Sequence, residues 1–185
     1  LSAGGGDIVL RGTGYGGTSS AHGIHVTGVS QIQTSGAGTI ALYGIGGAGT
    51  SGNRGVNITG GGSIASTGAG NITLDGIGGD GSSSDNRGVE INSTPIQATG
   101  TGSVIVLGQG GNGTSSNYGV RINAAVTTTS GDVSVSGTAG AGTSSDNHGL
   151  EMAAPVQTDS GNIFLTGTGG AGTTTTGGAG NGAAG

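Results

Sequence analysis

Bulky apolar residues recur in pairs, two positions apart, and each pair stands two positions before a glycine. The pattern returns about every 31 residues, which marks the chain as a repeat protein. Alternation with a period of two is typical of a β-strand with one buried face. The six pairs are Ile8/Leu10, Ile40/Leu42, Ile72/Leu74, Val104/Val106, Val133/Val135 and Ile163/Leu165.

Two further strands follow in each copy. A second set of apolar pairs comes directly after another recurring glycine: Ile24/Val26, Val56/Ile58, Val89/Ile91, Val120/Ile122 and Leu150/Met152. A third, weaker strand has one apolar residue with a small residue two positions later: Ile32/Thr34, Ile64/Ser66, Ile96/Ala98, Val126/Thr128 and Val156/Thr158. No copy contains the period of a helix.

Three short strands in each repeat predict an all-β fold, a parallel β-helix (β-solenoid) of between five and six coils. Equivalent residues of successive coils would stack ~4.8 Å apart and form inner columns of Ile, Val and Leu. We expect residues 1–172 to form a single solenoid domain. Residues 173–185 are rich in Gly and Thr and predict a flexible tail or a connection between repeats.

Composition taken alone argues against a folded chain, because 49 of the 185 residues are Gly and only 30% are hydrophobic. Low apolar content alone is typical of disorder. A random linker would not hold its apolar residues in register over six copies, however, so the repeat favours the solenoid. Glycines at fixed offsets supply turns and allow the backbones of neighbouring coils to approach closely.

Charge and cysteine content exclude several functions. The chain has no Cys, which excludes disulfides and thiolate metal sites. Its only strong cations are four Arg, and its net charge is −5, so we expect no nucleic-acid partner. The longest run of bulky apolar residues is 104–107, so we expect no membrane insertion.

Two adjacent columns precede the second strand and are the candidate site residues. The first column consists of Asn53, Asn86, Asn117 and Asn147, which we interpret as a structural ladder of stacked amides. The second column, called the stripe below, consists of His22, Arg54, Arg87, Tyr118 and His148. Cationic and aromatic side chains at one edge are used in carbohydrate or anionic-partner contacts, and solvated turn residues are the alternative interpretation.

The outward position of the second strand brings Arg121 between two carboxylates, Glu90 and Glu151, if the coils stack in register. We expect these cross-strand pairs to be exposed and to contribute only about tenths of a kcal/mol. Specification of the register is then their more important role.

Catalytic, cofactor and metal sites are not expected, because the nine acidic residues fall at different phases of the repeat. A Ca²⁺ site in the loop that contains Asp80 and Asp85 is an open alternative. Ice binding is another, although the column of Thr127 contains Gln33, Ala65, Gln97 and Gln157 and is therefore irregular.

The repeat resembles the Gly-rich β-strand repeats of large bacterial exoproteins of the filamentous-haemagglutinin-like, two-partner-secreted type. The resemblance rests on residues 70–82 (GNITLDGIGGDGS) and 86–91 (NRGVEI) and extends over residues 4–172. It implies export, a right-handed β-helical stalk and adhesion at a cell surface.

We therefore expect a structural, non-enzymatic segment of an extracellular fibre or cell-surface adhesin. Uncapped repeats either continue in sequence or stack on another copy, so head-to-tail self-association is expected. A glycan or the surface of a host or neighbouring cell is the other candidate partner. The alternative function is a carbohydrate-binding or polysaccharide-cleaving β-helix.

Overall fold

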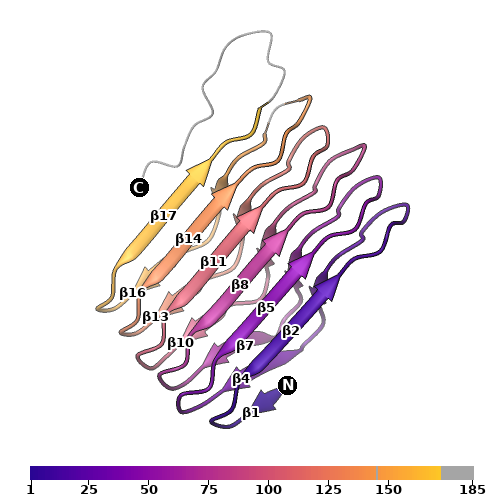
Figure 1. Ribbon diagram of the computed structural model, residues 1–185. Coiled ribbons are helices and arrows are strands. Elements are labelled where there is room, and N and C mark those ends of the chain that lie inside the picture. The colour runs from indigo at the N-terminus through magenta and orange to yellow at the C-terminus, as the bar shows by residue number, and fades with distance from the viewer. Residues whose placement is uncertain (145, 172–185) are drawn as a thin grey trace.

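Each recurring apolar pair forms a strand, and the equivalent strands of successive coils lie side by side in a parallel sheet (Figure 1). The computed structural model describes residues 1–144 and 146–171, which contain 17 strands and no helix. These strands form three sheets of six, five and six strands, so the predicted β-solenoid with three strands per coil is confirmed. The predicted tail, 173–185, lies outside the described residues.

The first sheet contains the longest strands, each of six residues. They are β2 (Ile8–Thr13), β5 (Ile40–Ile45), β8 (Ile72–Ile77), β11 (Val104–Gln109), β14 (Val133–Thr138) and β17 (Ile163–Thr168). Their pairing makes successive coils 32, 32, 32, 29 and 30 residues long. A Gly-rich segment follows each of the first five of these strands and protrudes at one edge of the solenoid (Figure 1).

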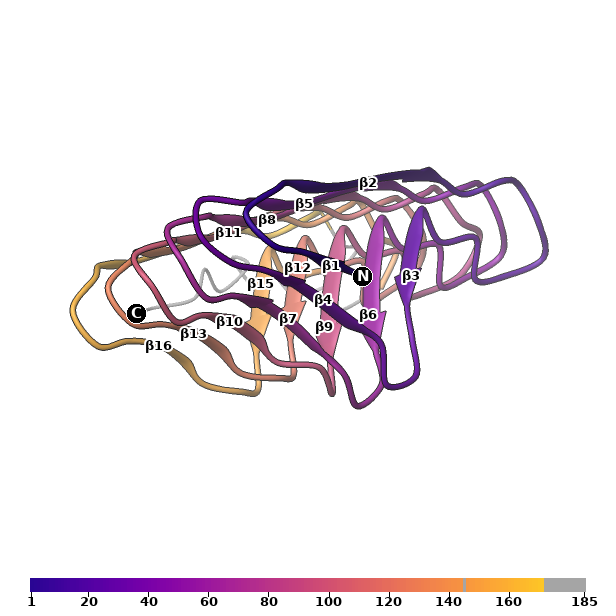
Figure 2. The same ribbon diagram turned by 90° about the horizontal axis from the view of Figure 1, so that it is seen from below.

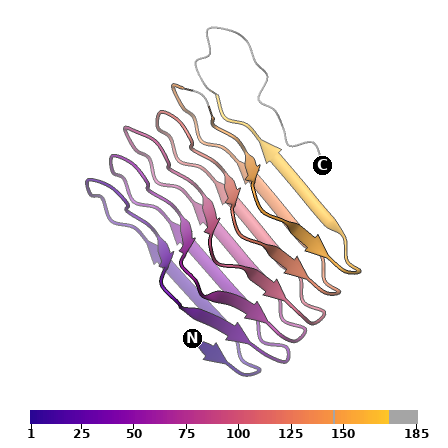
Figure 3. The same cartoon turned by 180° about the vertical axis from the view of Figure 1, so that it is seen from behind.

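The second and third sheets consist of shorter strands, seen from behind in Figure 3. The second sheet contains β3 (Ile24–Val26), β6 (Val56–Thr59), β9 (Val89–Asn92), β12 (Val120–Ile122) and β15 (Leu150–Met152). The third contains β1 (Ser2–Ala3), β4 (Gln31–Thr34), β7 (Ser63–Ser66), β10 (Ile96–Ala98), β13 (Val126–Thr128) and β16 (Val156–Thr158). In all three sheets the apolar residues pair in the register that the repeat predicts.

One strand was not expected from the sequence. Ser2 and Ala3 form β1, which pairs with Gln33 and Thr34 and so belongs to the third sheet. This strand contains no bulky apolar residue, and the alternation rule has nothing to detect there.

The core is a thin layer between the first sheet on one side and the second and third sheets on the other (Figure 2). Inward residues such as Leu42, Leu74, Ile58 and Ile91 are completely buried. Side chains between them on the same strands point outward, as the period of two requires. Regular stacking therefore buries a continuous core from a small number of apolar residues.

Small polar residues complete the core at the third sheet. The hydroxyl of Ser66 donates to the carbonyl of Gly70 at 2.7 Å, and the hydroxyl of Thr128 donates to the carbonyl of Gly131 at 2.6 Å. Both side chains are buried, and each satisfies a carbonyl of the turn that leads to the next coil. The hydroxyls of Ser66 and Thr128 thus have a structural role, whereas Ala98 occupies the same column without one.

Glycine is required where the first and second sheets converge. A Cβ atom on Gly76 would lie 2.2 Å from the carbonyl oxygen of Gly88, and one on Gly88 would lie 2.3 Å from the backbone nitrogen of Gln109. Real Cβ atoms do not approach backbone so closely, so the two sheets meet here through bare backbone. Coil-to-coil approach also requires glycine, since a Cβ on Gly79 would lie 2.1 Å from the carbonyl oxygen of Gly47.

Candidate functional site

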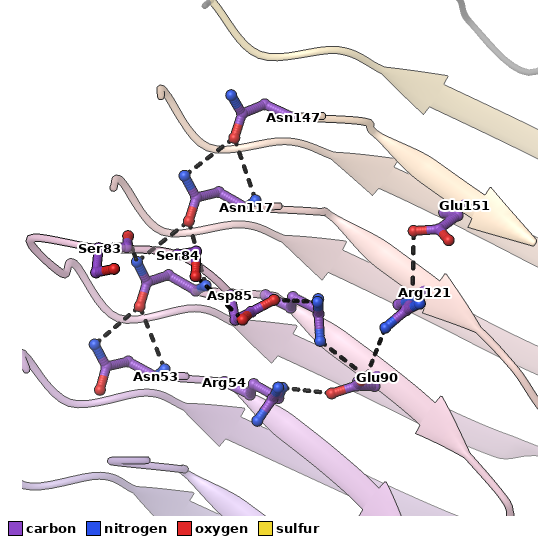
Figure 4. Close-up of polar contacts among 12 residues, drawn as sticks. Asn53, Arg54, Ser83, Ser84, Asp85, Glu90, Asn117, Arg121, Asn147 and Glu151 are labelled. Carbon is purple, nitrogen blue, oxygen red and sulfur yellow. Dashed lines mark hydrogen bonds and ion pairs between the residues drawn. The ribbon is translucent and has the colours of Figure 1, made fainter. Parts of the chain in front are cut away.

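The four predicted Asn residues form a continuous hydrogen-bonded ladder along the solenoid (Figure 4). Asn53 Nδ2 donates to Asn86 Oδ1 at 2.9 Å, and Asn86 Nδ2 donates to Asn117 Oδ1 at 3.2 Å. Asn117 Nδ2 continues the ladder to Asn147 Oδ1 at 3.0 Å. The Oδ1 atoms of Asn86, Asn117 and Asn147 each also accept the backbone N–H of the preceding Asn, at 3.2 or 3.3 Å. Asn53 Oδ1 accepts the backbone N–H of Ala21 at 3.3 Å. All four side chains are buried, so the ladder satisfies polar groups that water does not reach.

A left-handed residue precedes the Asn position in every described coil. Their φ angles lie between 56° and 69°: Ser20, Gly52, Asp85, Ser116 and Asp146. A non-glycine residue in this conformation costs about 1–2 kcal/mol. The conformation recurs even in the first coil, where Ala21 occupies the Asn position, so it belongs to the turn itself.

The stripe residues also stack in register. The N–H of the glycine after each of the first four stripe residues donates to the carbonyl of the stripe residue in the next coil, at 3.0 or 3.1 Å. The guanidinium carbon of Arg87 lies 5.1 Å from the centre of the Tyr118 ring. The Tyr118 and His148 rings are stacked with their centres 5.3 Å apart. Cation–π and ring contacts therefore join Arg87, Tyr118 and His148 within the stripe.

Burial differs along the stripe. Arg87 is 5% exposed and Tyr118 is also buried, whereas His22, Arg54 and His148 are partly exposed. Arg54 and Arg87 reach Glu90, an outward residue of β9, and so lie over the outer surface of the second sheet. A partner at this edge would contact mainly the two histidines and Arg54.

Glu90 is the centre of an ion network, and the expectation of an exposed pair here is wrong. The side chain of Glu90 is only 4% exposed although it points outward from β9, because arginines of its own and adjacent coils cover it. Arg87 Nη1 donates to Glu90 Oε1 at 2.9 Å, and Arg54 forms an ion pair with Oε2. Arg121 Nη1 lies 3.5 Å from Oε1.

Two further carboxylates balance the charge of this network. Asp85 forms an ion pair with Arg87, and Glu151 Oε2 lies 3.3 Å from Arg121 Nε (Figure 4). Three arginines and three carboxylates therefore meet on the second sheet; we call Arg54, Asp85, Arg87, Glu90, Arg121 and Glu151 the Glu90 cluster. The formal charges of the six side chains cancel.

His22 lies at the end of this cluster and is neutral. Desolvation, followed by the charge of Arg54, lowers the pKa of His22 to about 4. The ring accepts a hydrogen bond at Nδ1 from the backbone N–H of Arg54 at 3.4 Å, which requires an unprotonated nitrogen. Burial also lowers the pKa of Arg54 and raises the pKa of Tyr118.

A second set of polar residues was missed in the sequence. At the corner before the first sheet, side-chain oxygens accept the backbone N–H of the next coil: Asp7 from Thr39 at 2.8 Å, Asn71 from Ser103 at 2.8 Å, and Asp132 from Asn162 at 2.7 Å. Asp80 Oδ1 accepts the N–H of Asn112 at 2.9 Å at another corner. The signal was an Asp, Asn, Ser or Thr directly before each first-strand apolar pair.

The candidate metal ligands do not converge within residues 1–144 and 146–171. No group of three or more His, Cys, Asp or Glu side chains is placed to hold a metal ion there. Of the two residues considered for Ca²⁺, Asp80 accepts the N–H of Asn112 and Asp85 pairs with Arg87. The same part of the chain contains no helix long and apolar enough to cross a bilayer.

Comparison of the sequence with protein-family models and curated proteins, and of the fold with solved structures, gives no match.

Proposed function

We propose that this chain is a structural, non-enzymatic segment of an extracellular fibre or cell-surface adhesin. The observation that carries the proposal is the uniformity of coil stacking. Every described coil pairs with the next through three parallel ladders in constant register, and the Asn ladder runs through four coils in the same geometry. Such an arrangement resists extension along its axis, and further coils can be added to it in the same register.

The use of carboxylates supports a non-enzymatic role. Glu90, Asp85 and Glu151 are paired with arginines, and Asp7 and Asp132 accept backbone N–H groups of the next coil. A general acid or base needs a carboxyl group that is open to substrate and has a pKa suited to proton transfer. The carboxylates named here are instead bound in contacts that hold coils together.

The resemblance of the repeat to two-partner-secreted exoproteins supports an extracellular or cell-surface location. The sequence contains no Cys, so coil stacking relies on backbone ladders and side-chain contacts rather than on disulfides. A glycan or the surface of a host or neighbouring cell is the partner that this role implies.

Axial stacking is the second part of the proposal. The inward apolar columns are fully buried in the middle of the solenoid. At the last described coil they become exposed to solvent: Ile163 is 42% exposed and Met152 is 41% exposed. Another coil placed on this surface, from the same polypeptide or from another copy, would bury both residues and pair the outer edge of β17.

Light scattering across a concentration series tests axial stacking of the 185-residue chain. The double variant Ile163→Lys and Met152→Lys places two charges in the open columns, and Gln157→Lys with Thr166→Lys adds the same charges on the outside of the same coil. We expect the parent chain and the outward variant to form longer particles as concentration rises, and the inward variant to stay monomeric. Equal behaviour of the two variants, or a monomeric parent chain, would contradict axial stacking.

Hydrolysis assays on acidic and neutral polysaccharides test the non-enzymatic part separately. We expect no turnover. Turnover that disappears on Asp80→Asn or Asp85→Asn would establish the polysaccharide-cleaving alternative instead.

A further inference from the structure

A shallow groove runs along the solenoid axis on the outer face of the first sheet. It lies over the column of inward glycines that includes Gly44 and Gly76, between two columns of outward side chains. Two adjoining depressions of about 330 and 220 Å³ share Asp75 and Ile77, so the groove continues across at least four coils. The floor carries no outward side chains, because the floor residues face the interior of the solenoid.

One wall of this groove is apolar in the middle of the solenoid. Ile45 is 47% exposed and Ile77 is 41% exposed, and the two residues are direct neighbours across β5 and β8. Leu107, next to Asp75 across β8 and β11, is an exposed apolar residue on the opposite wall. These coils have neighbours on both sides, so the exposure does not result from an open end of the solenoid. Contiguous exposed apolar side chains are typical of a binding surface.

The polar groups of the groove have unused hydrogen-bonding capacity. The guanidinium of Arg11 lies 4.3 Å from the centre of the Tyr43 ring and holds the ring in place. Asp75 is the next residue along this wall, directly beside Tyr43. Both Asp75 and Gln109 border the groove, and among the described residues neither side chain forms a hydrogen bond or ion pair.

We propose that this groove binds a neutral, linear glycan that lies parallel to the solenoid axis. Apolar side chains and the Tyr43 ring pack on the C–H faces of sugar rings, while Arg11, Asp75 and Gln109 bind hydroxyl groups. Arg11 and Asp75 are the only charged residues among the groove walls, and their charges cancel. A polyanion therefore gains no net attraction here, which favours an uncharged ligand.

Two other occupants fit the face less well. An extended peptide binds a sheet by pairing with a free strand edge, but the inner strands β5 to β14 are paired on both sides. A second copy of the chain would need more area. Six strands at about 4.8 Å spacing and six residues at about 3.3 Å rise cover only about 570 Å², below the ~800 Å² per partner of a stable interface.

This inference deepens the adhesin part of the proposed function and rests on it for its biological context. Binding is therefore measured on dilute chain, at concentrations where light scattering reports a monomer, so that glycan binding and axial stacking succeed or fail independently. The probes are neutral β-linked hexasaccharides of glucose, xylose and mannose, with the corresponding disaccharides and a hexamer of galacturonic acid.

Titration calorimetry with these probes gives distinct outcomes. We expect one or more neutral hexasaccharides to bind, with affinity that rises from disaccharide to hexasaccharide because the groove spans several coils. Tyr43→Ala should weaken binding about tenfold or more. Gln97→Ala, on the outer side of the third sheet, should leave affinity and melting temperature unchanged and serves as the matched control.

Several results would overturn the proposal. One is the absence of binding by every neutral hexasaccharide at millimolar concentration. If the galacturonic acid hexamer binds more tightly than the neutral hexasaccharides, the ligand is not neutral. If disaccharide and hexasaccharide bind with equal affinity, the ligand does not extend along the groove over several coils. A dimer that Tyr43→Ala dissociates would identify the face as a contact between copies. Circular dichroism of each variant excludes misfolding as the cause of lost binding.

Discussion

Arg87 donates a hydrogen bond from Nη1 to Oε1 of Glu90 at 2.9 Å, and both side chains are almost completely withdrawn from solvent. Arg54 and Arg121 approach the same carboxylate from the neighbouring coils. One carboxylate thus links three successive coils on the outside of the second sheet. Removal of one partner from a buried network leaves the remaining charges without compensation, which costs far more than an exposed ion pair contributes.

Replacement of Glu90 by Gln should destabilise the fold strongly. The change keeps the shape of the side chain but leaves three arginines facing a neutral amide, so we expect a loss of about 3–5 kcal/mol in the free energy of unfolding. Chemical denaturation measures this loss. Asp159→Asn makes the same change of charge at an exposed residue and should alter stability by less than about 0.5 kcal/mol. Equal losses of unfolding free energy in the two variants would show that the network does not stabilise the fold.

Glycine positions offer a contrast between two chemically identical changes. In Gly76→Ala the new Cβ meets the carbonyl of Gly88 at 2.2 Å and the Cγ2 of Val89 at 2.8 Å, so the first and second sheets must separate. We expect a loss of about 3 kcal/mol or more. A Cβ on Gly61 meets nothing within 4 Å, and Gly61→Ala should change stability by about 1 kcal/mol or less. Thermal melting of both variants decides the point; a Gly76→Ala protein as stable as Gly61→Ala would refute the close approach of the sheets.

The strand register could be predicted from the sequence because two independent signals agree. Alternation of Ile72 and Leu74 assigns the inward face, and Gly76 marks the same phase in each copy, so a slip of one residue would expose the core. Polar residues lack this constraint. Alternation correctly placed Glu90 on the outside of β9, but burial depends on whether side chains from other coils fold over it, and no periodic signal reports that.

The groove on the first sheet was missed for a related reason. Ile45 and Ile77 stand at outward positions, one after each recurring glycine, and are visible in the sequence as apolar residues out of phase. Single exposed apolar residues are common on protein surfaces and do not by themselves indicate a binding site. Only the register of β5 and β8 shows that they are neighbours on the same wall.

Acid should destabilise the protein partly through His22. The pKa of His22 is lowered to about 4 in the folded chain, against about 6.5 for an unperturbed His, so the unfolded chain binds more protons between these values. Stability therefore falls as pH decreases from 6.5 toward 4. Because the ring is only half-buried, we expect about 1–2 kcal/mol from this group. The difference in unfolding free energy between the parent chain and His22→Gln, measured from pH 4 to 7, isolates the contribution. A difference that is constant with pH would mean that His22 titrates normally.

The Asn ladder should fail when its middle member is changed. Asn117 accepts the side chain and backbone N–H of Asn86 and donates to Asn147, all in a buried environment. Asn117→Ala leaves these groups without partners, and we expect a loss of about 2–4 kcal/mol in unfolding free energy. Asn117→Asp keeps the shape and the acceptor but cannot donate to Asn147 when ionised. It should therefore also destabilise the fold, and less so at acidic pH, where the carboxyl is protonated.

Gln157→Ala, at an exposed residue of β16, is the control for chemical denaturation. If Asn117→Ala unfolds at the same denaturant concentration as this control, the ladder does not stabilise the solenoid.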